Sequence, residues 1–184
     1  METIGAGRSP ISNADRLAVA VSLVVLWVAG TNATGSGGQS AAGANSTGAK
    51  PPTVLFLCPH GAAKSVLASA YFQRLAKERG LNVRVESAGT DPDPDVAPAV
   101  VSHLRAQGYD VPAAKPRRAT AADMATADVV VSLGCDLKDL PAPRGTLVRW
   151  DDVPAPSADF DRAAEKIRER VMELVEELVR KQQR

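Results

Sequence analysis

Residues 53–65 read Thr53-Val54-Leu55-Phe56-Leu57-Cys58-Pro59-His60-Gly61-Ala62-Ala63-Lys64-Ser65. The stretch begins with a continuous apolar run that ends at Cys58, which is typical of a buried parallel strand. From Lys64 the apolar residues recur at helical spacing, and Gly80 supplies a stop signal for that helix. The sequence therefore predicts a strand, a loop and a helix, with the loop at the carboxyl end of the strand.

The residues that follow alternate between strand and helix patterns. Further strands are expected at 82–86, 128–133 and 146–149, and helices at 98–107, 121–127 and from 159 onward. The last helix is long and amphipathic. Residues 91–95 alternate Asp and Pro and are predicted to form a turn rather than a calcium site. Strands that alternate with helices imply parallel βαβ units in a doubly wound α/β sheet, where ligands bind beyond the carboxyl ends of the strands.

Composition narrows the class of protein. A length of 184 residues with 45% apolar and 23% charged residues fits one globular domain with appendages. A net charge of +1 and only 4% aromatic residues argue against nucleic-acid binding. The two cysteines exclude a disulfide framework and a four-thiolate zinc site, and the sequence predicts no metal and no cofactor.

Residues 1–50 are not predicted to belong to the domain at 51–184. Residues 17–30 form an apolar run after Arg8 and Arg16, too short for a typical membrane span and closer to the apolar core of a secretory signal. Residues 35–50 are rich in Gly, Ser and Ala and predict a flexible linker. The protein is expected to be exported or tethered to a membrane if residues 17–30 act as a signal or anchor. It is expected to be cytoplasmic if that run is an unused extension.

The loop after the first strand carries the chemistry. A strand–loop–helix turn points backbone N–H groups and a helix N-terminus at one spot, which binds anions and favours a thiolate. Gly61 allows the positive φ that such a loop needs. We expect an oxyanion to be bound by a set of loop residues: Pro59, His60, Gly61, Ala62, Ala63, Lys64 and Ser65.

Three segments resemble the low-molecular-weight protein tyrosine phosphatase superfamily, which includes thiol-dependent arsenate reductases. They are Val54–Cys58 with Lys64-Ser65, then Glu86-Ser87-Ala88-Gly89-Thr90, and then Ala127–Cys135. The resemblance implies a flavodoxin-like three-layer α/β/α fold with four parallel strands. It also implies that Cys58 attacks phosphate or arsenate and that the Ser65 hydroxyl stabilises the thiolate.

The chain departs from the family pattern at three places. Lys64 stands where the family has arginine, so a point charge replaces a planar fork. Ala155 occupies the position of the family's acidic residue, and Asp152 is our candidate for the missing general acid. Cys135 matches one redox cysteine of the arsenate reductases, but no second one follows nearby.

Three functions remain open at this point. The first is hydrolysis of phosphate monoesters, on a small molecule or a protein, through a thiophosphate on Cys58. The second is arsenate reduction, in which the oxidation passes to an external thiol or to Cys135. The third is a catalytically weakened domain that binds phosphate or another oxyanion, which the replacements at Lys64 and Ala155 favour.

Overall fold

The computed structural model describes residues 50–111 and 115–184. The chain divides into two units, Met1–Asn45 and Ser46–Arg184, and every described element belongs to the second. The predicted signal or anchor at 17–30 lies outside the described residues, as does nearly all of the linker. Among the helices that are described, none is both long and apolar enough to cross a membrane.

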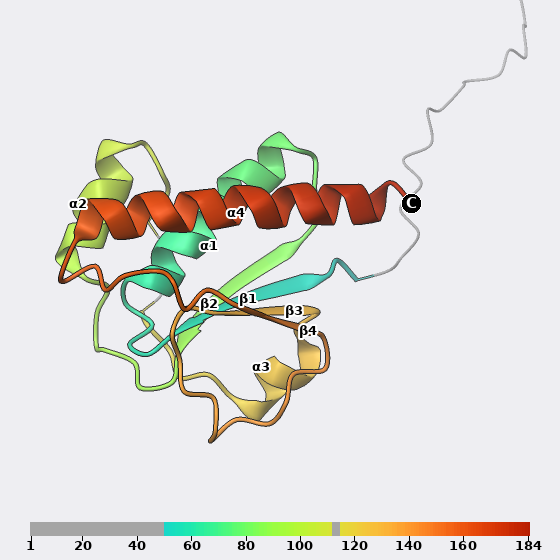
Figure 1. Ribbon diagram of the computed structural model, residues 1–184, viewed down its shortest axis with the longest axis horizontal. Coiled ribbons are helices and arrows are strands. Elements are labelled where there is room, and N and C mark those ends of the chain that lie inside the picture. The colour runs from blue at the N-terminus through green and yellow to red at the C-terminus, as the bar shows by residue number, and fades with distance from the viewer. Residues whose placement is uncertain (1–49, 112–114) are drawn as a thin grey trace, which may run out of the picture. The chain divides into compact units, whose positions relative to one another are not determined.

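Four strands form one parallel sheet in the order β2-β1-β3-β4 (Figure 1). Their bounds are β1 Thr53–Cys58, β2 Arg84–Gly89, β3 Val129–Ser132 and β4 Thr146–Arg149. All six residues of β1 are buried, because it has a strand on each side and helices over its faces, and this explains its continuous apolar run. The predicted flavodoxin-like α/β fold with four parallel strands is confirmed.

The second strand differs from its prediction. The sequence indicated residues 82–86, where apolar and polar residues alternate, but β2 continues to Gly89. Its last residues are small, and they pair with the end of β1: Phe56 with Ser87, Leu57 with Ala88 and Cys58 with Gly89. Small side chains at the end of β2 are explained by the close approach of the loop that follows β1, described below.

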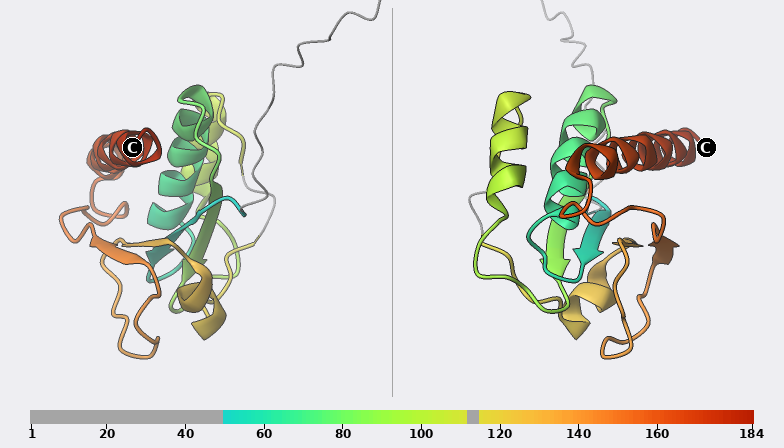
Figure 2. Two further views of the ribbon diagram at one scale, coloured as in Figure 1. Left: turned by 90° about the vertical axis from the view of Figure 1, so that its right-hand side faces the viewer. Right: turned by 60° about the vertical axis from the view of Figure 1, so that its left-hand side comes forward.

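The helices cover both faces of the sheet (Figures 1 and 2). On one side lie α1 (Lys64–Glu78), α2 (Pro98–Ala106) and α4 (Phe160–Gln182), with α1 packed against both α2 and α4. The short α3 (Ala121–Thr126) lies on the other side. The buried face of α4 consists of Ala163, Ala164, Ile167, Val171, Leu174 and Val175. It agrees with the amphipathic pattern predicted for the last helix, except that two residues of the predicted apolar face, Phe160 and Leu178, are only half-buried.

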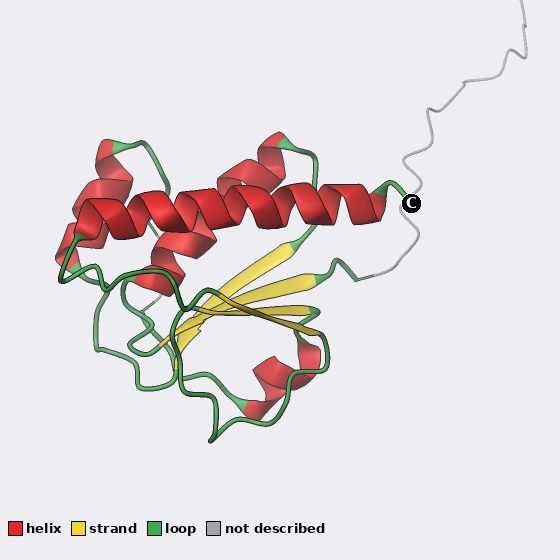
Figure 3. Cartoon of the chain, in the orientation of Figure 1, coloured by secondary structure: helices red, strands yellow, loops and turns green. Residues whose placement is uncertain are grey.

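All four strands end at the same edge of the sheet, since they are parallel. The loops that follow β1 and β2 meet there, as Figure 3 shows, and backbone hydrogen bonds join them. The chain that leaves β4 returns to the same edge, where the Trp150 N–H donates to the Ser132 carbonyl at 2.8 Å. Cys58 therefore lies where three loops converge.

Candidate functional site

The loop of residues 59–63 joins the end of β1 to the start of α1 and places Cys58 next to Ser65. The Cys58 thiol donates to the Ser65 hydroxyl with 3.2 Å between Sγ and Oγ, and both side chains are buried. When the thiol loses its proton, the direction reverses and the Ser65 hydroxyl donates to the sulfur. The two residues that the sequence assigned to the nucleophile and its stabiliser are thus in direct contact.

The loop rests against the end of β2 through two glycines. Gly61 has a φ of 60°, and a Cβ atom there would lie 2.9 Å from the Gly89 nitrogen. A Cβ atom on Gly89 would lie 2.6 Å from the Gly61 nitrogen. Both distances are too short for a real side chain, so glycine at these two positions lets the backbones touch.

Residues 91–97 fix the direction of the loop peptides. Asp91, Asp93 and Ala97 donate their backbone N–H groups to the carbonyls of Pro59, His60 and Ala62, at 2.8, 3.0 and 3.0 Å. In a trans peptide the carbonyl and the following N–H point in opposite directions. The N–H groups that follow these carbonyls are therefore turned away from residues 91–97. On the other side of the loop they can serve as backbone donors to an anion.

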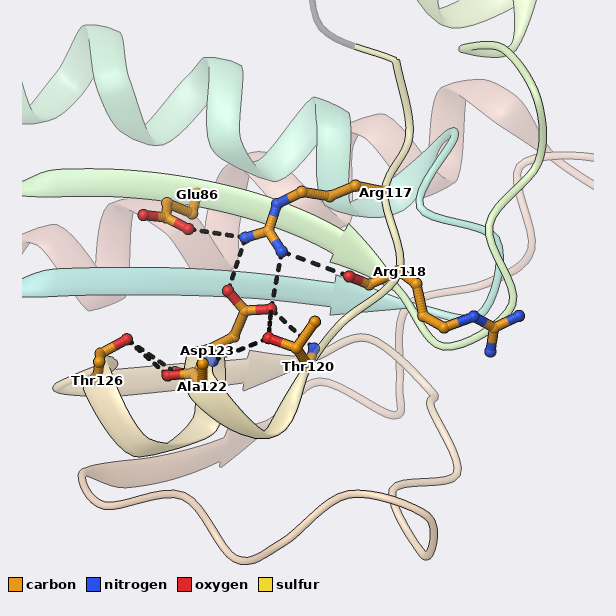
Figure 4. Close-up of polar contacts among 7 residues, drawn as sticks. All are labelled: Glu86, Arg117, Arg118, Thr120, Ala122, Asp123 and Thr126. Carbon is orange, nitrogen blue, oxygen red and sulfur yellow. Dashed lines mark hydrogen bonds and ion pairs between the residues drawn. The ribbon is translucent and has the colours of Figure 1, made fainter.

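A second layer of contacts holds Gly89 in place. Its N–H donates to the Arg117 carbonyl at 2.9 Å, and its carbonyl accepts from the Ala119 N–H at 2.8 Å. The Arg117 guanidinium in turn donates to Asp123 at 2.7 and 3.0 Å and to Glu86 at 2.7 Å (Figure 4). The hydrogen bond to Asp123 is the main cause of the raised pKa of Arg117. The ion pairs therefore tie residues 117–119, the segment that holds Gly89, to β2 and to α3.

Cys135 is the second cysteine near the loop. It follows Gly134, which has a φ of 78°, and its backbone N–H donates to the Ser132 hydroxyl at 3.3 Å. Burial raises the pKa of the Cys135 thiol to about 11, and the neighbouring charge of Cys58 adds to the rise. The two cysteines are thus within electrostatic reach of each other, and Cys135 is a neutral thiol at neutral pH.

Lys64 supplies the positive charge of the site. Its ammonium lies 3.2 Å from the point where a Cβ atom on Gly134 would stand, so it reaches across toward Cys135. Within residues 50–111 and 115–184 it forms no ion pair with a carboxylate. Its charge is therefore available for an anion bound at the loop.

A pocket of about 430 Å³ opens over Cys58. Most of its wall is apolar and comes from α2, from the residue before it, from the chain before α4 and from the first residue of α4: Ala97, Ala99, Val100, Ala155, Pro156 and Phe160. Its ionisable groups are Cys58, His60, Lys64 and Asp93. The pocket thus joins a charged end at the thiol to a mainly apolar space.

The structure places Asp152 apart from this pocket. Its carboxylate accepts from Arg170 Nη2 at 2.6 Å, and the Lys166 ammonium lies 3.7 Å away. The hydrogen bond from Arg170 is the main cause of a lowered pKa of Asp152. Asp152 lines another surface depression, together with Lys166.

One ionisable residue of the pocket was not singled out by sequence reasoning. Asp93 lies in the segment predicted as a turn, and its Oδ1 is 3.4 Å from Nδ1 of His60. The only sequence signal was an acidic stretch that follows the second strand, which does not say which aspartate faces the loop. In the described part of the chain, no group of three His, Cys, Asp or Glu side chains could hold a metal ion.

Comparison with known proteins places the fold and the loop in one family. Residues 53–146 match the model of the low molecular weight phosphotyrosine protein phosphatases. This match covers half of the chain, so the protein belongs to that family. The family contains cysteine-dependent phosphatases and arsenate reductases.

Solved structures of both kinds are similar to this chain. An arsenate reductase from Archaeoglobus fulgidus is 31% identical, with a TM-score of 0.54. The match covers 66% of this chain and 98% of that protein. A thioredoxin-dependent arsenate reductase of Corynebacterium glutamicum is 29% identical over 69% of this chain, with a TM-score of 0.60, and the match spans 61% of that protein. A low molecular weight phosphotyrosine phosphatase from Vibrio cholerae O395 is 24% identical over 69% of this chain, with a TM-score of 0.61, and the match spans 96% of that protein. The last of these shows the fold alone.

Proposed function

We propose that this protein hydrolyses phosphate monoesters by nucleophilic attack of Cys58. The observation that carries the proposal is the pocket of about 430 Å³, which sets the Cys58 thiol and the Lys64 ammonium beside a mainly apolar wall. A phosphate would occupy the loop, and an aryl or alkyl group would contact Ala97, Val100 and Phe160. Such a pocket is larger than an inorganic oxyanion needs, which favours an organic ester.

The positions of the loop groups support the following reaction. The Cys58 thiolate attacks phosphorus, so that an S–P bond forms while the ester P–O bond breaks and the leaving oxygen takes up a proton. Water then attacks phosphorus, the S–P bond breaks, and phosphate and the thiolate are released. The loop N–H groups and Lys64 stabilise the charge on the other phosphate oxygens, and Ser65 donates to the sulfur when it leaves.

Lys64 affects the efficiency of this reaction. An arginine at this position would bind two equatorial oxygens with parallel N–H groups, whereas lysine offers a point charge. Binding of the anion is less sensitive to this change than stabilisation of the transition state. We therefore expect slow turnover, and Lys64→Arg should increase it.

Arsenate reduction is the second candidate, and Cys135 favours it. The Cys58 thiolate would displace water from arsenate and form an S–As(V) bond. The Cys135 thiol, after losing its proton, would then attack the Cys58 sulfur, so that a Cys58–Cys135 disulfide forms and arsenic leaves as As(III) with the two electrons. An external thiol or dithiol reduces the disulfide afterwards. The two arsenate reductases described above, at 29% and 31% identity, support this candidate.

One paired experiment separates these functions. The full chain and the variants Cys58→Ser and Cys135→Ser are assayed for hydrolysis of para-nitrophenyl phosphate and for arsenate-dependent oxidation of dithiothreitol. A phosphatase loses hydrolysis only in Cys58→Ser, and a reductase with an internal relay loses dithiol oxidation in both variants. Phosphate binding by the unmodified chain, with neither activity above Cys58→Ser, would contradict both and identify a binding domain.

A further inference from the structure

The pocket at Cys58 has to supply a proton to the leaving oxygen of an ester. Without a donor, the leaving group departs as an unprotonated alkoxide or phenoxide, which is slow for all but the most acidic alcohols. Four ionisable groups line the pocket: Cys58, His60, Lys64 and Asp93. Cys58 is the nucleophile and Lys64 balances the charge of the phosphate, so His60 and Asp93 remain.

The residue expected from the sequence, Asp152, is not placed to fill this role. Asp152 is bound by Arg170 at 2.6 Å, and this contact lowers its pKa and keeps the carboxylate charged. It also lines a depression separate from the pocket at Cys58. Ala155 does line the pocket, but its methyl group has no proton to give.

His60 is attached to Asp93 at two points. The Asp93 N–H donates to the His60 carbonyl at 3.0 Å, and the two side chains meet with 3.4 Å between Nδ1 and Oδ1. Because Nδ1 faces the carboxylate, the other ring nitrogen, Nε2, remains for the substrate. A carboxylate on one ring nitrogen fixes the tautomer and the orientation of an imidazole. The side chains are 65% and 52% exposed, so the ring can exchange protons with water as well as face the pocket.

We propose that His60 is the general acid and base of this site and that Asp93 is its positioning residue. The inference rests on the proposed hydrolysis of phosphate esters. In the first step Nε2–H of the imidazolium gives its proton to the ester oxygen while the P–O bond breaks and the S–P bond forms. In the second step the neutral imidazole takes a proton from the attacking water while the S–P bond breaks, which restores the imidazolium and the Cys58 thiolate.

The test compares esters whose leaving groups differ in their need for a proton. Phenyl phosphate releases a weakly acidic phenol and needs the donor, whereas 2,4-dinitrophenyl phosphate releases a phenolate that leaves unaided. For His60→Gln we expect kcat/KM to fall by about 100- to 10,000-fold on phenyl phosphate and by less than about tenfold on the dinitrophenyl ester. Asp93→Asn keeps the backbone contact and loses the charge, so it should show the same selectivity with a smaller loss.

Binding of inorganic vanadate is measured on the same variants. If His60 carries the proton, vanadate affinity changes far less than the rate on phenyl phosphate. Equal losses on both esters together with a matching loss of vanadate affinity would show that His60 only binds the anion, and would overturn the inference. Asp152→Asn is the rival variant, and a dependence on the leaving group there, in place of His60→Gln, would also overturn it. Wild-type rates no higher than those of Cys58→Ser on both esters would instead refute the proposed function, and this inference with it.

Discussion

At the scale of single residues, the contact between Gly61 and Gly89 determines the shape of the site. Gly61 adopts a positive φ and lies against the backbone of Gly89, so a methyl group at either position would displace the loop. The displaced peptides are those whose N–H groups we propose as donors to the anion. Two residues without side chains thus control the geometry around Cys58.

Gly61→Ala tests this contact, and Gly80→Ala is its matched control. Both glycines have a positive φ, 60° and 67°, but no atom lies within 4 Å of a Cβ placed on Gly80. The unfavourable backbone conformation should therefore cost each variant about 1 kcal/mol of unfolding free energy, and the close contact with Gly89 should add to the loss in Gly61→Ala. Only Gly61→Ala should also lose activity, by about 100-fold, because a displacement of the loop misplaces its donors.

Denaturant unfolding and kcat/KM are measured on both variants. Equal activity in the two would show that the loop tolerates a side chain at residue 61. In that case the close approach to Gly89 would have no part in forming the site.

At the scale of elements, residues 117–119 are held by two sets of ion pairs, one of which is more buried than the other. Arg117 joins β2 to α3 through Glu86 and Asp123, and the Asp123 side chain is only 14% exposed. The neighbouring Arg118 pairs with Asp91, whose side chain is 85% exposed. Water screens the second pair far more than the first.

Arg117→Met should therefore lower the unfolding free energy by about 1–2 kcal/mol, since the partly buried Asp123 keeps its hydrogen bonds from Thr120 but loses its charged partner. Arg118→Met should cost less than about 1 kcal/mol, because an exposed ion pair contributes little. Urea unfolding of the two variants gives the comparison. A larger loss for Arg118→Met would mean that Arg118 contributes more to this segment than its exposure indicates.

At the scale of the whole molecule, the fold buries a titratable thiol near the reactive one. Burial raises the pKa of Cys135 from an ordinary value of 9.0 to about 11, and the charge of Cys58 contributes to the rise. Between these two values the folded state holds a proton that the unfolded state has lost. The contribution of Cys135 to stability is therefore complete below about pH 9 and is lost as the pH rises to about 11.

Unfolding free energies of the wild type and Cys135→Ser, measured from pH 8 to 11, test this linkage. The wild type should lose stability more steeply above pH 9 than the variant, whose hydroxyl does not titrate in this range. Burial also raises the pKa of Tyr71. Tyr71 is present in both proteins, so its effect on the unfolding free energy cancels in the difference. Parallel curves would show that Cys135 titrates alike in the folded and unfolded states.

The sequence alone determined the strands, the order of most elements and the position of the loop. Periodicity along the chain reports which residues are buried, and the run before Cys58 and the pattern of α4 were unambiguous in this respect. The resemblance to the phosphatase family identified the Cys58–Ser65 pair, and both residues belong to one short strand–loop–helix segment of the sequence.

Only the tertiary structure decided which distant groups meet this loop. Asp93 and Cys135 come close to it because parallel strands end at one edge of the sheet, and neither position is encoded by local pattern. The extension of β2 to Gly89 depends on its hydrogen bonds with β1. The contact between Asp152 and Arg170 depends on how the chain before α4 lies against that helix. Such contacts arise from packing between segments far apart in sequence, which periodicity along a single segment cannot report.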